Sequence, residues 1–169
     1  MNILVCGFMG SGKTTFVESF RGNLLGFDCI DLDAAVSSSL GILPSELGEW
    51  INRYGLENFR QKEMFILKGL LQNRMMKIIA LGGGTIEGSG YKDLTSVAKT
   101  IFLNVPFETC FKRIKNDSNR PLTSLGEAGL QDLYNKRIPK YLTSDLCLSE
   151  HEIKEIDGLD SLVHNLSNT

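Results

Sequence analysis

Eight residues near the N-terminus form the pattern of a phosphate-binding loop. A glycine, four variable residues, a second glycine, a lysine and a hydroxyl residue occur in Gly7-Phe8-Met9-Gly10-Ser11-Gly12-Lys13-Thr14. Glycines let the backbone wrap closely enough for several N–H groups to face phosphate oxygens, and a following helix offers its N-terminal amides to the same anion. Lys13 would neutralise the β- and γ-phosphates, and Thr14 would offer a hydroxyl to Mg²⁺. The loop predicts binding of a nucleoside triphosphate and leaves the phosphate acceptor open.

Two carboxylates follow the next apolar run. Asp31 and Asp33 come directly after residues 28–30, and a period-two spacing would send both side chains to the same side of a strand. One carboxylate could then serve a metal ion and the other the acceptor. The same pair is also typical of a turn that ends in a helix cap, so the residues alone leave both interpretations open.

Arginines and glycines stand in distinctive contexts further along the chain. Arg60 and Glu63 are one helical turn apart and could form an ion pair, although this spacing is also common on ordinary helix faces. Gly82-Gly83-Gly84 follows an apolar run, where it would let a ligand approach the main chain or simply form a flexible turn. Arg120 lies in a polar stretch that is typical of an exposed loop, and Arg137 lies near the end of the next helical segment.

Taken in chain order, these patterns resemble those of the shikimate kinase family. The resemblance covers residues 7–141 and rests on the phosphate loop, Asp31-Leu32-Asp33, Gly55-Leu56-Glu57-Asn58-Phe59-Arg60, Gly82-Gly83-Gly84, Arg120-Pro121-Leu122 and Arg137-Ile138-Pro139-Lys140-Tyr141. It implies transfer of the ATP γ-phosphate to the 3-hydroxyl of shikimate, which gives shikimate 3-phosphate and ADP in the pathway to chorismate and aromatic amino acids.

The resemblance also implies a role for each residue at a motif position. The acceptor would be held by Asp33, Arg60, Gly83 and Arg137, and the two guanidinium groups suit its carboxylate. The nucleotide would be held by Gly10, Ser11, Gly12, Lys13, Thr14, Thr15, Arg113 and Arg120. One Mg²⁺ per subunit would be bound directly by Thr14 and through a water by Asp31. The catalytic residues would be Lys13 and Arg120, which stabilise the transferring phosphoryl group, and Asp33, which orients or deprotonates the attacking hydroxyl.

The chain departs from the family pattern at four places. Thr14 stands where many members have serine, but the hydroxyl is retained. Ser37 replaces a common acidic residue, and Ile51 replaces an aromatic residue of the acceptor pocket. The stretch 149–152 lacks the arginine that often joins the adenine site, so Arg113 is the one adenine contact that the resemblance predicts here.

Strands and helices alternate along the chain. Apolar runs at 3–6, 28–30, 77–81, 100–105 and 145–149 are typical of strands, and helices are expected at about 13–25, 106–114, 126–142 and 158–167, with two or three more between 34 and 73. Such alternation builds a parallel sheet with helices on both faces, and ligands bind at the carboxyl ends of its strands. The resemblance implies a P-loop fold of the nucleoside-monophosphate-kinase-like α/β type with a five-stranded parallel sheet. We expect one domain over 1–169, with a shikimate-binding helical region at about 33–62 and a lid at about 115–125.

Composition limits the other functions of the chain. A formal net charge of −2 over 169 residues gives no basic field that would favour nucleic acid. No apolar run approaches the roughly 18 residues of a membrane span, and we expect no signal peptide. The four cysteines are widely spaced, so we expect buried, reduced thiols. We therefore expect a cytoplasmic monomer whose partners are ATP and shikimate.

Two other functions share part of this pattern. Gluconate and nucleotide kinases use the same phosphate loop, but nucleotide kinases need more arginines for an acceptor phosphate, whereas Asp33 with two arginines suits one carboxylate and several hydroxyls. A catalytically idle relative that only binds or regulates should have lost part of the machinery, and here all the motif residues are present.

Overall fold

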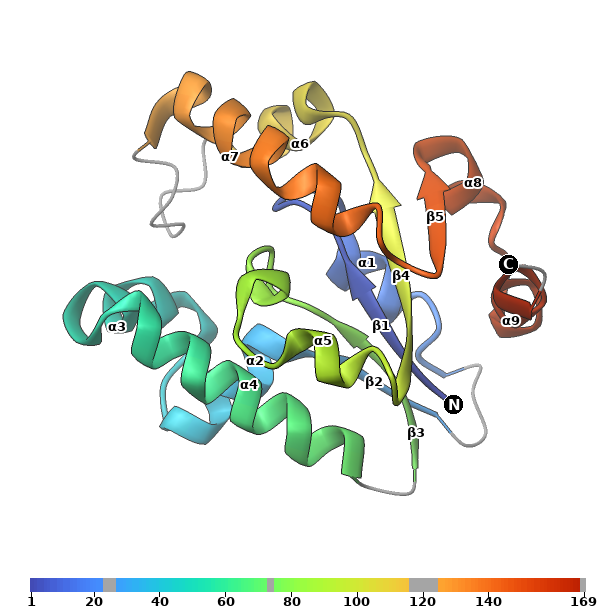
Figure 1. Cartoon of the computed structure of the whole chain (residues 1–169), viewed down its shortest axis with the longest axis horizontal. Helices are drawn as coiled ribbons and strands as arrows, with labels where there is room; N and C mark the ends of the chain where they lie inside the picture. The colour runs from blue at the N-terminus through green and yellow to red at the C-terminus, as the bar shows by residue number, and fades with distance from the viewer. Residues whose placement is uncertain (23–26, 73–74, 116–124, 168–169) are drawn as a thin grey trace.

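Five parallel strands form one sheet in the order β2-β3-β1-β4-β5 (Figure 1). The computed structural model describes residues 1–22, 27–72, 75–115 and 125–167. The strands are β1 (Asn2–Cys6), β2 (Phe27–Asp31), β3 (Met76–Ala80), β4 (Ala98–Asn104) and β5 (Leu146–Ser149). The central strand β1 is paired on both sides, with Ile3 opposite Ile78 and Lys99. The expected parallel sheet is confirmed.

Most of the helices lie where the sequence predicts them. They are α1 (Lys13–Glu18), α2 (Leu32–Leu40), α3 (Leu47–Tyr54), α4 (Leu56–Gln72), α5 (Tyr91–Leu94), α6 (Phe107–Ile114), α7 (Gly126–Tyr141), α8 (Glu150–Glu155) and α9 (Leu159–Ser167), with short 3₁₀ turns η1 (Pro44–Glu46) and η2 (Thr85–Glu87). The short helices α5 and α8 were not predicted. The expected extent of α1 to about residue 25 is wrong, because the chain tightens after Glu18 and the Arg21 N–H bonds back to the Glu18 carbonyl.

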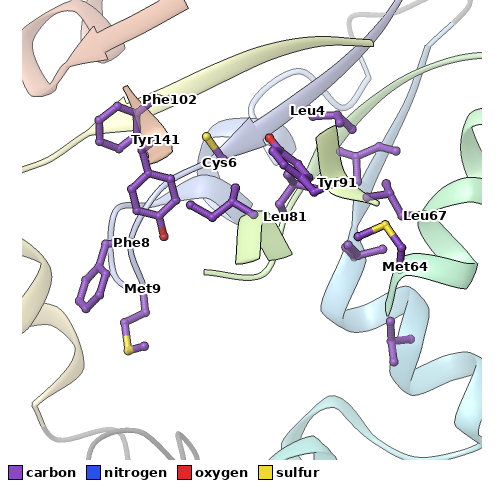
Figure 2. Close-up of a cluster of buried hydrophobic side chains, with 14 of the residues drawn as sticks. Leu4, Cys6, Phe8, Met9, Met64, Leu67, Leu81, Tyr91, Phe102 and Tyr141 are labelled. Carbon is purple, nitrogen blue, oxygen red and sulfur yellow. The ribbon is translucent and has the colours of Figure 1, made fainter. Parts of the chain in front are cut away.

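The sheet is buried on both faces, as its nearly continuous apolar strands require. Leu4 and Cys6 of β1 point into a core shared with α2 to α7, whereas Ile3 and Val5 point into a second core with α1 and α9. Figure 2 shows the first of these cores, where the ring of Tyr141 from α7 stacks on Phe102 of β4 at a centroid distance of 5.0 Å. This contact fixes the C-terminal end of α7 on the sheet.

The cysteines and the helix lengths bear on two further expectations. No helix in the described ranges is both long and apolar enough to cross a bilayer. All four cysteines are free; Cys6 and Cys110 are buried, Cys29 is half-buried and Cys147 is exposed. The expectation of a buried thiol is wrong for Cys147, because β5 is an edge strand and its alternate side chains reach solvent.

Candidate active site

The phosphate loop connects β1 to α1 at the carboxyl edge of the sheet. Gly10 adopts a positive φ of 82°, and a Cβ there would lie 2.6 Å from the Cys110 carbonyl oxygen, so the loop packs directly against α6. The Ser11 hydroxyl is buried and has no hydrogen-bond partner among the residues that the structure describes. Gly12 precedes the first turn of α1 with a φ of 91°. The loop therefore has the conformation that only glycines allow at these two positions.

Lys13 lies inside this loop rather than in solvent. Its side chain is buried, and Nζ donates hydrogen bonds to the carbonyl oxygens of Gly7 at 2.9 Å and Phe8 at 3.0 Å. The positive charge is thus held at the concave side of a backbone turn that precedes a helix N-terminus. That is where the β- and γ-phosphates of a nucleotide bind in this type of loop.

Asp31 links the phosphate loop to the second strand. One carboxylate oxygen accepts a hydrogen bond from the Thr14 hydroxyl at 2.6 Å, and the other caps α2 by accepting one from the Ala34 amide at 3.0 Å. The prediction that Asp31 and Asp33 share one side of a strand is wrong in its reason, because β2 ends at Asp31 and Asp33 lies in the first turn of α2. Both carboxylates nevertheless line the same cleft.

The cleft has a volume of about 680 Å³ and lies at the carboxyl ends of β1, β2 and β3. Its wall is built from the phosphate loop, the helical segment after β2, the triple glycine and α7. The residues that line it are Met9, Thr14, Glu18, Asp31, Asp33, Ala34, Pro44, Ser45, Leu47, Gly48, Ile51, Phe59, Arg60, Gly82, Gly83, Gly84 and Arg137. All four of the predicted acceptor residues are among them, together with Ile51.

Two carboxylates meet beside Gly82. A Cβ at Gly82 would lie 2.6 Å from Glu63 Oε1 and 2.9 Å from Asp33 Oδ1, so glycine leaves the room that this pair needs. Burial, and then the charge of Glu63, raises the pKa of Asp33 to about 6, against the opposing charges of Lys13 and Arg60. A carboxylate with a pKa this close to neutrality is a stronger base than an ordinary aspartate and is still ionised at pH 7.

Arg60 is held by the expected ion pair. Its Nη1 lies 2.6 Å from Glu63 Oε2, and the other oxygen of this fully buried glutamate accepts a hydrogen bond from the Thr85 hydroxyl at 2.6 Å. The guanidinium is therefore anchored on one edge while Arg60 still lines the cleft. Sequence reasoning missed Thr85, which lies directly after the triple glycine but belongs to no recognised pattern.

Arg137 is more deeply buried than Arg60 and is held by a residue that sequence reasoning also missed. Its Nε and Nη2 both donate to Glu87 Oε2, at 2.9 and 2.6 Å, and its side chain is only 4% exposed. The Tyr141 hydroxyl, one helical turn further, donates to the Gly83 carbonyl oxygen and joins α7 to the triple glycine. A glutamate three residues after the glycines gave no signal in the sequence.

The opposite end of the phosphate loop is bounded by Arg113 and α8. Arg113 Nη1 donates to the Gly10 carbonyl oxygen at 2.9 Å, and Nη2 lies 3.1 Å from Glu150 Oε1. The segment after β5 thus contributes a carboxylate where the family resemblance predicts an arginine. Arg120 and almost all of the predicted lid lie outside the described residues, so that catalytic assignment stays a prediction.

Comparisons with known proteins match most of the chain to shikimate kinases. A family model described as shikimate kinase matches residues 9–166. A shikimate kinase of Thermodesulfovibrio yellowstonii is 32% identical over 150 residues, which cover 87% of this chain and 84% of that protein. The structure of an Acinetobacter baumannii shikimate kinase in complex with shikimate superposes with a TM-score of 0.81 at 27% identity, covering 99% of this chain and 94% of that one.

A gluconokinase from Sinorhizobium meliloti resembles the chain less closely. Its structure superposes with a TM-score of 0.59 at 15% identity, covering 99% of this chain and 91% of that one, and it shares the fold alone.

Proposed function

The chain belongs to the shikimate kinase family, and from this premise we propose how its own residues divide the work of the reaction. The enzyme transfers the γ-phosphate of ATP to the 3-hydroxyl of shikimate, giving shikimate 3-phosphate and ADP. The observation that carries the assignment of roles is that the cleft beside Lys13 is lined by one carboxylate with a raised pKa and by two anchored arginines.

The acceptor end of the cleft suits an anion that also carries hydroxyls. Arg60 and Arg137 would hold the carboxylate of shikimate, because guanidinium groups match carboxylates in shape and charge. Asp33 would accept a hydrogen bond from a ring hydroxyl, and its pKa of about 6 makes it the residue that takes up the proton of the attacking oxygen. Gly83 would offer its backbone amide to the same ligand.

The nucleotide end of the cleft is built from the phosphate loop. The backbone from Gly10 to Thr15 would bind the phosphates, with Lys13 placed to stabilise the charge that develops on the transferring group. Arg113 would pack on adenine from its position beside the Gly10 carbonyl. Arg120 would add a second cation to the phosphoryl group during transfer, as the family resemblance implies.

Thr14 and Asp31 fit a magnesium site. Their hydroxyl and carboxylate oxygens lie 2.6 Å apart beside the phosphate loop, and Mg²⁺ prefers oxygen donors of these kinds. We propose that Thr14 binds the ion directly and Asp31 through a water, one ion per subunit. When bound, Mg²⁺ would neutralise the phosphate charge, while the protein's part is to hold the two oxygen donors in place.

Replacing Thr14 with valine should therefore raise the Mg²⁺ concentration needed for half-maximal activity by about tenfold or more, because valine keeps the shape and removes the hydroxyl. Titrations of MgCl₂ at a fixed ATP concentration measure this value. Thr14→Ser is the matched control, since it restores the oxygen and should behave like the unmodified enzyme. An unchanged Mg²⁺ requirement in Thr14→Val would show that the hydroxyl is not a ligand.

The substrate assignment is tested by measuring ADP release with shikimate, gluconate and AMP as acceptors. We expect turnover with shikimate and no more than background with the other two, because an acceptor site with two arginines and Asp33 matches one carboxylate and several hydroxyls. Turnover with gluconate or AMP in place of shikimate would favour the alternative small-molecule kinases. Absence of turnover with all three would favour a regulatory relative.

We further propose that the enzyme works as a monomer in the cytoplasm. The free thiols of Cys6 and Cys110, buried in the core, suit a reducing compartment.

A further inference from the structure

The guanidinium groups of the two arginines of the acceptor site converge beside Gly84. A Cβ at Gly84 would lie 2.1 Å from Arg60 Nη2 and 2.7 Å from Arg137 Nη2, so both guanidinium groups converge on the space that this glycine leaves open. Two positively charged groups that converge on one space repel each other, and burial strengthens the repulsion. Each therefore needs a carboxylate of the protein to remain in the site.

The two cations are anchored by different carboxylates. Glu63 holds Arg60 from the next turn of α4, where the helical spacing predicts it. Glu87 holds Arg137 from η2, which is the segment directly after the triple glycine, and it comes 50 residues earlier in the chain than its partner. The ion pair with Arg137 holds the pKa of Glu87 below its ordinary value although burial opposes this. Glu87 is thus ionised at neutral pH.

Glu87 occupies one edge of the Arg137 guanidinium and leaves the other nitrogen, Nη1, without a protein partner among the described residues. A single oxygen of Glu87 takes the edge formed by Nε and Nη2. Nη1 is buried and has no hydrogen-bond partner in the described structure. It lies on the side of Gly83, where a Cβ would be 3.8 Å away, and both residues line the cleft. An unsatisfied buried donor costs free energy that a carboxylate ligand would recover.

We propose that Glu87 is a positioning residue for shikimate binding: it fixes Arg137 by one edge against the repulsion of Arg60, so that the guanidinium stays in the wall of the cleft where the carboxylate of the acceptor binds. This inference rests on the proposed role of Arg137. Glu87 itself does not touch the acceptor. The shikimate carboxylate does not change during phosphoryl transfer. Glu87 therefore strengthens binding of the ground state and the transition state equally, which lowers the KM for shikimate and leaves kcat almost unaltered.

The test compares shikimate with its methyl ester, which has the same hydroxyls and no carboxylate. In Glu87→Ala and Glu87→Gln we expect the KM for shikimate to rise by about tenfold or more, with kcat within about threefold and the KM for ATP unchanged. The KM for the methyl ester should be the same in the Glu87 variants as in the unmodified enzyme. Glu57→Gln, the same change at an exposed glutamate of α4, is the matched control.

Each other outcome overturns the inference. An unchanged KM for shikimate would mean that Arg137 needs no anchor, and a lower KM would make Glu87 a competitor for the arginine. An equal rise for acid and ester would point to a general distortion of the cleft. If Glu87→Ala does not fold, Glu87→Gln, which keeps the size of the side chain, decides the matter. Failure of the proposed function would look different, because the unmodified enzyme would then not turn over shikimate, and both proposals would fall.

Discussion

Replacing Lys13 with alanine or methionine is expected to lower the kcat of shikimate phosphorylation by at least about a thousandfold. The Lys13 ammonium is buried and held by the carbonyl oxygens of Gly7 and Phe8, so its charge is fixed beside the space for the transferring group. A charge that is already in place and partly removed from water stabilises the transition state without reorganisation. The measurement is ADP release at saturating ATP, Mg²⁺ and shikimate.

Two comparisons separate the charge of Lys13 from its packing. Methionine retains most of the aliphatic stem and loses the ammonium, so Lys13→Met and Lys13→Ala should be equally inactive if charge is what matters. Lys112→Met makes the same change at an exposed position of α6 and should keep full activity. Retention of more than about a tenth of kcat in Lys13→Met would contradict the role, because removing a single transition-state donor normally costs at least about a hundredfold.

The fold was largely predictable because it depends on periodic apolar residues. Runs such as Ile3–Cys6 and Lys77–Leu81 can bury both faces only in a parallel sheet covered by helices on each side, and the structure has this arrangement. The elements that were missed are short. The helix Tyr91–Leu94 has a single turn, and Glu150–Glu155 has six residues and begins with a capping box on Ser149. Elements of this length do not show a full helical period in the sequence.

The described residues that line the cleft were predictable where a motif marks them and not where only the fold brings them together. The phosphate loop, Asp33 and Arg60 are recognised by neighbours in the sequence, and the structure brings them to one cleft. Glu87 and Glu150 belong to the site through contacts across 50 and 37 residues of sequence, with Arg137 and Arg113 respectively. No local spacing predicts such pairs, since they form only when the sheet brings the ends of different strands together.

Asp33→Asn is expected to lower kcat/KM for shikimate by at least about a hundredfold, because an amide cannot take up the proton of the attacking hydroxyl. In the unmodified enzyme, kcat/KM should fall as the pH drops through about 6, the pKa that burial and the charge of Glu63 give to Asp33. Activity of Asp33→Asn above about a tenth of the original value would exclude Asp33 as the base.

The same substitution is expected to stabilise the folded protein at high pH and to leave its stability unchanged at low pH. Folding raises the pKa of Asp33 from 3.8 to about 6, so the folded state binds this proton more tightly than the unfolded chain does. The free energy of unfolding therefore falls as the pH rises from about 4 to about 6, and the deficit persists above that range. The upper bound of this loss in the free energy of unfolding is about 3 kcal/mol, and partial solvation of the cleft reduces it to the order of 1 kcal/mol, or roughly 2–4 °C in Tm.

Asparagine carries no charge, so Asp33→Asn should melt at a higher temperature than the unmodified enzyme at pH 8 and at the same temperature at pH 4. Asp93→Asn, at an exposed carboxylate, should show no such pH-dependent difference. If Asp33→Asn is more stable only at high pH and has lost turnover, the ionised carboxylate that acts as the base also lowers the free energy of unfolding. A lower Tm of Asp33→Asn at pH 8 would show that the ionised carboxylate does not destabilise the fold.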